Sequence, residues 1–201
     1  MLFASILLMS MQLAGAAEKA PTKAETLVNE ADASHLAFQL NSAGEVVHIQ
    51  SGMKCVLGAT EFSLRKLIIF SRSPPGDDVA CDYATPHGTV TVFATRLNGR
   101  RVEAAAFDIF KAMGTSFPKG KLVKGPLVAS YPGLIDPISA SIEVPSPDGT
   151  ILSSAWVAEA QGWLIEVRAT YPLAEQHDTE LVSALSSISA RVSINGHNQK
   201  P

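Results

Sequence analysis

Apolar and polar positions alternate along several short segments of this chain. In residues 138–144 and 163–170 every second side chain is apolar, which predicts strands with one buried face. Pro86-His87-Gly88 and Gln161-Gly162 predict tight turns between strands. Other β-rich segments bounded by turn residues predict further strands at 36–40, 46–50, 64–70, 79–84, 89–95 and 150–160.

Two segments have helical spacing instead. One apolar stripe is formed by Val102, Ala105, Ala106, Ile109, Phe110 and Met113. Gly114 follows this stripe and is predicted to cap the helix. Pro172 is predicted to open a last helix, with a buried face made of Leu181, Leu185, Ile188 and Val192.

These elements predict an α+β fold, a layered sandwich in which amphipathic helices pack on an antiparallel β-sheet. Residues 27–192 are expected to form this single domain. Segment 64–70 is apolar on both faces and is predicted to be a central strand, while Gly52 is a candidate bulge. Trp156 and Trp163 flank one hairpin and are expected to share a face and to anchor the helix layer.

The N-terminus has the pattern of an export signal. The apolar run Leu2–Leu13 leads into small residues, which predicts a signal peptide at residues 1–16 and cleavage near Ala16-Ala17. A retained membrane anchor is the alternative, but a span needs about 20 apolar residues. We therefore expect a periplasmic or secreted protein with a flexible leader at 17–26 and a flexible tail at 193–201.

The only two cysteines are Cys55 and Cys81. In an oxidising compartment they are expected to form a disulfide worth about 3 kcal/mol or somewhat more. A reactive thiol is the alternative, although a C-x-x-C motif is absent. In a strict up-and-down meander the two cysteines would lie at different edges of the sheet, so a proven disulfide would count against that topology.

Charge and hydropathy exclude some partners. The formal net charge is −3 and no basic stripe is present, so nucleic acid is not an expected partner. No second long apolar stretch follows the signal, so no stable membrane span is expected after cleavage.

Recognisable reaction motifs are absent. The five histidines show no metal-binding spacing, and His48, in a strand, is expected to be a satisfied or edge residue and not a metal ligand; a zinc site built from distant residues stays open as an alternative. Neither G-x-S-x-G nor G-x-x-x-x-G-K-[ST] occurs. We therefore expect no cofactor, no metal and no catalytic residue.

Several acidic residues are candidates for acid–base chemistry. Asp77-Asp78 falls in a Pro-Pro-Gly turn, where Asp commonly bonds to the backbone. If the polar faces of neighbouring strands align, we expect a solvated array of charged residues on a polar sheet face. Its members would be Glu143, Glu159, Glu166 and Arg168.

The segment Val102–Val192 resembles PsbP-like domains in its element order. It contains the helix A-A-F-D-I-F-K-A-M, then hairpins that include Ala155-Trp156 and Trp163-Leu164, and then a closing helix. The resemblance is architectural, covers about half of the chain and leaves out both cysteines. It implies an α/β/α sandwich around an antiparallel sheet and a non-enzymatic role as a partner or assembly factor.

The leading hypothesis for function is an exported, non-catalytic domain that binds a protein partner or a small apolar ligand. The alternative is an exported hydrolase or thiol-dependent enzyme with a dispersed site. That alternative predicts a pocket with at least two titratable groups of shifted pKa. A purely structural envelope component is a third possibility.

Overall fold

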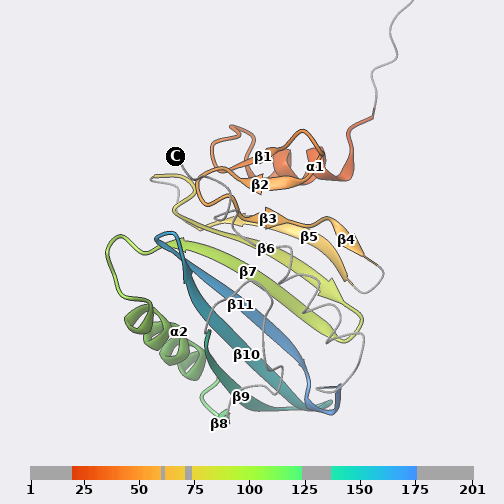
Figure 1. Cartoon of the computed structure of the whole chain (residues 1–201). Helices are drawn as coiled ribbons and strands as arrows, with labels where there is room; N and C mark the ends of the chain where they lie inside the picture. The colour runs from red at the N-terminus through yellow and green to blue at the C-terminus, as the bar shows by residue number, and fades with distance from the viewer. Residues whose placement is uncertain (1–19, 60–61, 71–73, 124–136, 176–201) are drawn as a thin grey trace, which may run out of the picture.

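The computed structural model describes residues 20–59, 62–70, 74–123 and 137–175, and antiparallel strands dominate them (Figure 1). The elements follow in the order α1 (Lys23–Ala31), β1 (Phe38–Leu40), β2 (Val46–His48), β3 (Lys54–Cys55), β4 (Gly58–Ala59), β5 (Phe62–Ile69), β6 (Asp78–Thr85), β7 (Gly88–Arg96), α2 (Val102–Ser116), β8 (Lys121–Val123), β9 (Ile138–Ser146), β10 (Gly149–Ala160), β11 (Trp163–Pro172) and η1 (Leu173–Glu175).

The large sheet has the strand order β4-β5-β6-β7-β11-β10-β9-β8. Strands that follow one another along the chain pair as antiparallel neighbours, and β7 joins β11 at the centre. Side chains alternate between the two faces of a strand. We call the side that carries Val92 and Val167 the inner face, and the side that carries Phe93 and Glu166 the outer face.

One end of the inner face is covered by a second sheet. Strands β1, β2 and β3 form this small sheet, which lies with α1 at one end of the large sheet (Figure 1). Phe38 and Met53 from this part of the chain join Tyr83 and Trp163 of the inner face in one buried cluster. The main core is therefore a contact between two sheets.

Asp32 fastens the end of α1 to β1. Its Oδ2 accepts hydrogen bonds from the backbone N–H groups of Ala37 at 2.6 Å and Phe38 at 3.0 Å. Burial alone would raise the pKa of Asp32, but these bonds and the one from Ser34 hold it below its usual value.

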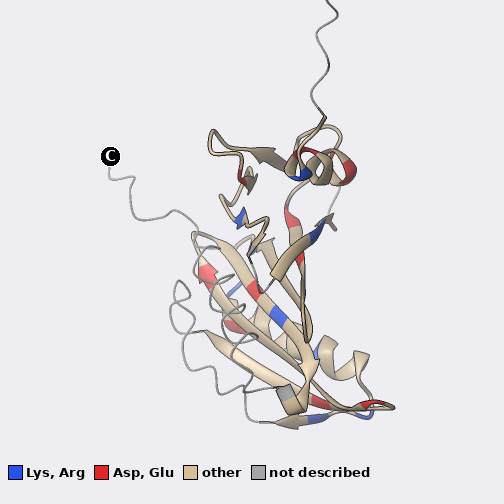
Figure 2. Ribbon diagram, turned by 90° about the vertical axis from the view of Figure 1, so that its right-hand side faces the viewer, with Lys and Arg blue, Asp and Glu red and all other residues tan. Residues whose placement is uncertain are grey.

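Helix α2 packs on the outer face (Figure 2). Ala105 and Ala106 contact Val157 and Leu164, and Met113 lies in a cluster farther along β9 and β10. The apolar stripe predicted from the sequence is therefore the face that packs on the sheet. The helix does not cover β5 and β6 (Figure 1), and Phe70, just beyond β5, is 53% exposed.

The predicted α+β layered sandwich is wrong. The described part of the chain is mostly antiparallel β-sheet, and its two helices are short. The segments at 36–40 and 46–50 form strands, but they build a separate sheet that packs on one end of the inner face, where a helix layer was expected. Trp156 and Trp163 do share a face, but it is the inner one, opposite α2.

The folded part begins earlier than expected. The flexible leader was placed at 17–26, but α1 already begins at Lys23. Thr22 and Glu25 form a capping box, in which Glu25 N–H donates to Thr22 Oγ1 at 3.3 Å and Thr22 N–H donates to Glu25 Oε2 at 2.6 Å. This reciprocal pair satisfies donors at the helix start, which explains why the helix begins there.

Three smaller expectations also need correction. Gly114 does not cap α2, which continues to Ser116. Gly52 is part of the turn between β2 and β3, with φ +72°, and not a bulge. The segment predicted as a central strand is β5, which lies next to the edge strand β4.

Other expectations lie outside the described residues. These are the signal peptide at 1–16 with its cleavage site, the tail at 193–201 and the last helix, except that Pro172 ends β11 and a 3-10 turn follows it. No helix in the described part of the chain is long and apolar enough to cross a membrane.

Candidate functional site

A pocket of about 280 Å³ opens on the outer face, between the sheet and the first half of α2. Its apolar lining is formed by Phe70, Phe93, Leu97, Ala105, Ile109 and Leu164. Its polar lining is formed by Asp78, Thr95, Arg96, Arg100, Asp108 and Glu166. A mostly apolar concavity with a few polar groups is the usual form of a small-molecule site, and this one lies at the small end of the size range.

The sheet register places two carboxyl groups in this pocket. Asp78 of β6 pairs with Thr95 of β7, and Thr95 pairs with Leu164 of β11. Glu166 is on the same face of β11, opposite Phe93 of β7. The two acids therefore lie on either side of β7 on the outer face, separated by one strand.

Asp78 makes a single side-chain hydrogen bond in the described part of the chain. Thr95 Oγ1 donates to its Oδ1 at 2.8 Å. Burial raises the pKa of the Asp78 carboxyl, and the Thr95 bond opposes this only in part. No Lys or Arg among the described residues forms an ion pair with Asp78.

Glu166 is almost fully buried and has an internal counter-ion. It is 5% exposed, and Arg168 donates to its Oε1 from Nη2 at 2.6 Å and from Nε at 2.9 Å. Burial raises the pKa of Glu166, the charge of Arg168 lowers it, and the nearby Asp78 raises it further. The Glu166–Arg168 pair has no net charge when both groups are ionised.

Two aromatic rings form one wall of the pocket. Phe70 and Phe93 stack with ring centroids 5.9 Å apart and an interplanar angle of 25°. The guanidinium of Arg168 lies over the Phe93 ring, 5.4 Å from its centroid. This wall therefore combines an apolar surface with an affinity for cations.

The arginines of the pocket have partners of their own. Arg100 pairs with Asp108 at 2.6 Å on the exposed rim. Arg96 Nε donates to Asp77 Oδ1 at 2.8 Å, and its guanidinium lies 4.3 Å from the centroid of the Trp163 ring. Both positive charges are thus already balanced within the protein.

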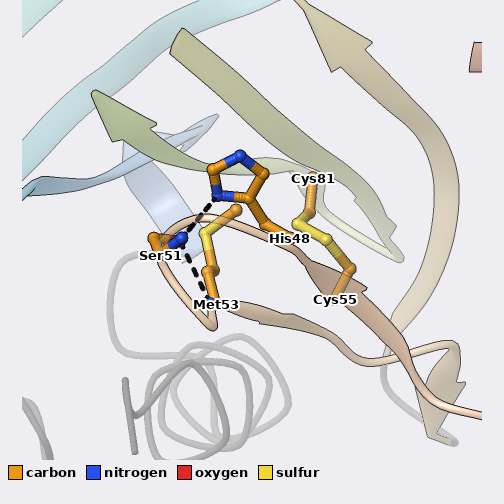
Figure 3. The surroundings of a disulfide bond; sticks show 5 residues. All are labelled: His48, Ser51, Met53, Cys55 and Cys81. Atoms are coloured by element: carbon orange, nitrogen blue, oxygen red, sulfur yellow. Dashed lines mark hydrogen bonds between the residues drawn. A yellow bond between two sulfur atoms is a disulfide. The ribbon is translucent and has the colours of Figure 1, made fainter. Parts of the chain in front are cut away.

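The two cysteines predicted to pair do form a disulfide (Figure 3). Cys55 in β3 and Cys81 in β6 are fully buried, with Cα atoms 5.7 Å apart. The reactive-thiol alternative is therefore wrong. The bond joins the small sheet to the inner face, which resolves the topological conflict because the chain is not a single strict meander. It is also on the opposite face of the large sheet from the pocket.

His48 is fully buried in β2, the middle strand of the small sheet. Its Nδ1 shares a hydrogen bond of 2.7 Å with Ser51 Oγ, and Ser51 Oγ accepts from Met53 N–H at 3.1 Å (Figure 3). The ring meets Trp163 edge-on with centroids 5.2 Å apart. Among the described residues, no group of three or more His, Cys, Asp and Glu side chains could hold a metal ion.

We expect His48 to make the protein less stable in mild acid. Burial, aided by the charge of Arg96, lowers the pKa of His48 from 6.5 to about 4. Between these two pH values the unfolded chain binds a proton that the folded protein does not, so stability falls as the pH falls. From pH 7 to 4.5 the wild type should lose about 2 kcal/mol more than His48→Asn in urea unfolding. Identical pH profiles of the two proteins would contradict this assignment.

The carboxyl groups of the pocket were not identified from the sequence. Asp78 was assigned to a turn, but it begins β6 and points to the outer face. The proposed array does not form, because Glu143 lies on the inner side of the register and Glu166 is buried. Alternation alone places Glu166 and Arg168 on one face, but only the β6–β7–β11 register brings Asp78 near them.

Comparison with known proteins did not identify a family for this chain. The chain matches no protein-family model and no curated protein sequence.

Proposed function

We propose that this chain is an exported, non-catalytic domain that binds a small, largely apolar ligand in the pocket of the outer face. The observation that carries the proposal is the pocket itself, with one wall of stacked aromatic rings and another from α2. Phe70 is 53% exposed although it belongs to this wall. A ligand on the ring would remove apolar surface from water, which is the main driving force for such binding. The apolar run Leu2–Leu13 and the disulfide support export.

The size of the pocket limits the affinity that apolar contacts can supply. A ligand with a phenyl-sized body would bury roughly 150 Å² of apolar surface, worth about 4 kcal/mol at ~25 cal/mol per Å². That free energy corresponds to a Kd of about 1 mM. Tighter or more selective binding would need a polar contact in addition.

An enzyme with a dispersed site is the second candidate. It is favoured by Asp78 and Glu166, two carboxyl groups with raised pKa in one pocket. Against it, Arg168 already binds Glu166 through two hydrogen bonds, and the lining residues that the structure describes include no Ser, Cys or His nucleophile. Steady turnover by the pure protein, lost in Glu166→Gln, would establish this candidate over the binding domain.

The binding proposal is tested with two matched phenylalanines. We expect 2-phenylethanol to bind with a Kd in the millimolar range, measured by NMR titration. Phe70→Ala should weaken this binding about fivefold, because part of the aromatic wall is lost. Phe107→Ala is the control, since Phe107 is 67% exposed on α2 and does not line the pocket. No binding, or equal weakening by both variants, would contradict the proposal.

A further inference from the structure

We propose that the pocket of the outer face selects a small amine, and that Asp78 binds its ammonium group while the aromatic pair binds its apolar body. This inference rests on the proposed function and adds the chemical class of the ligand. Its starting point is the balance of charges around the pocket.

Among the described residues that line the pocket, Asp78 is the charged group without a counter-ion. Arg96 pairs with Asp77, and Arg100 pairs with Asp108. Glu166 is bound by Arg168. Asp78 has only the hydroxyl of Thr95, which donates a hydrogen bond but no charge. An amine would complete the charge balance, whereas a carboxylate ligand would meet uncompensated negative charge.

The neighbours of Asp78 suit an amine that carries an apolar group. Phe70 N–H donates to the Asp78 carbonyl oxygen at 2.9 Å, so the two residues lie side by side on adjacent strands. The Phe70 ring continues into the stack with Phe93. An ammonium group at the Asp78 carboxylate would therefore place a short hydrocarbon body against these rings.

The aromatic wall already binds one cation. The guanidinium of Arg168 lies over the ring of Phe93, although it also pairs with Glu166. Phe70 is exposed and belongs to the same wall, and an ammonium group over the face of a phenylalanine ring is attracted by the ring quadrupole in the same way. Burial of the Asp78 carboxyl acts in the same direction, since a partly desolvated anion gains more from a nearby cation than a solvated one.

The test compares three probes with the same phenyl body and different head groups: 2-phenylethylamine, 2-phenylethanol and 3-phenylpropionate. At pH 7 and low salt, isothermal titration calorimetry or NMR should give an amine affinity at least about tenfold above that of the alcohol. The carboxylate should bind more weakly than the alcohol. This order needs no variant, so it holds as a test even if a substitution disturbs folding.

Asp78→Asn then locates the head-group contact. Its amide oxygen can still accept from Thr95, so the fold should be kept and thermal unfolding checks this. Amine affinity should fall about tenfold while alcohol affinity changes by less than twofold. Asp148→Asn is the matched control, because Asp148 is exposed in the turn between β9 and β10 and does not line the pocket, and the loss of its charge should change amine affinity by less than twofold.

The outcomes separate this inference from the proposed function. If amine and alcohol bind equally, or if Asp78→Asn leaves amine binding unchanged, the assignment of Asp78 is overturned and the apolar pocket stands. If the carboxylate binds best, the inferred charge preference is wrong. If none of the three probes binds, the proposed function fails as well.

Discussion

Replacement of Trp163 by alanine is expected to lower the free energy of unfolding by about 4 kcal/mol. The side chain is 3% exposed and lies in the main core between the two sheets. Its ring makes an edge contact with the ring of His48, and the guanidinium of Arg96 lies over its face. Truncation leaves a cavity and removes both contacts, so the small sheet loses a principal contact with the inner face.

Urea unfolding followed by circular dichroism measures this effect. Trp163→Phe is the control, because it keeps an aromatic ring in the core and should cost less than half as much. If Trp163→Ala lowers the free energy of unfolding by less than about 1 kcal/mol, Trp163 is not a principal contact between the small sheet and the inner face.

Removal of the disulfide by Cys55→Ala with Cys81→Ala should cost about 3.5 kcal/mol. The bond closes a loop between two cysteines with a sequence separation of 26. Without it the unfolded chain has more conformational entropy, so the unfolded state is stabilised. Alanine is the suitable replacement because both positions are fully buried, where a serine hydroxyl would add its own desolvation cost.

Reduction provides an independent control for this prediction. A reducing agent should lower the stability of the wild type toward that of the double variant and leave the double variant unchanged. If the double variant keeps the stability of the oxidised wild type, the disulfide does not stabilise the contact between the small sheet and the inner face.

Local patterns were enough to find most of the described strands. Pro86-His87-Gly88 and Gln161-Gly162 both form the turns expected of them, between β6 and β7 and between β10 and β11. A turn is determined by residues close in sequence, and alternation then decides which side chains share a face.

The placement of the small sheet could not be found in this way. Segments 36–40 and 46–50 are predicted as ordinary strands, but whether they extend the large sheet or pack against it depends on contacts with residues far along the chain. The Cys55–Cys81 disulfide does indicate this placement, because a single up-and-down meander would not bring the two cysteines together. The resemblance to PsbP-like domains stays a prediction.

The pocket could not be predicted from the sequence for a related reason. Asp78 and Glu166 are far apart in sequence and meet only because β7 pairs with both of their strands. Their raised pKa values result from burial under neighbouring elements, which no spacing rule encodes. The sequence predicts Phe70 only as part of a strand. Its exposure depends on which elements pack over the outer face.

The most direct test of the account is to map where a ligand binds. In a titration of isotopically labelled protein with 2-phenylethylamine, followed by amide NMR, we predict shifts concentrated at Phe70, Asp78, Phe93, Thr95 and Glu166 and at the start of α2. Shifts centred on the small sheet or the inner face, or no saturable shifts at all, would contradict the claim that the outer face carries the binding site.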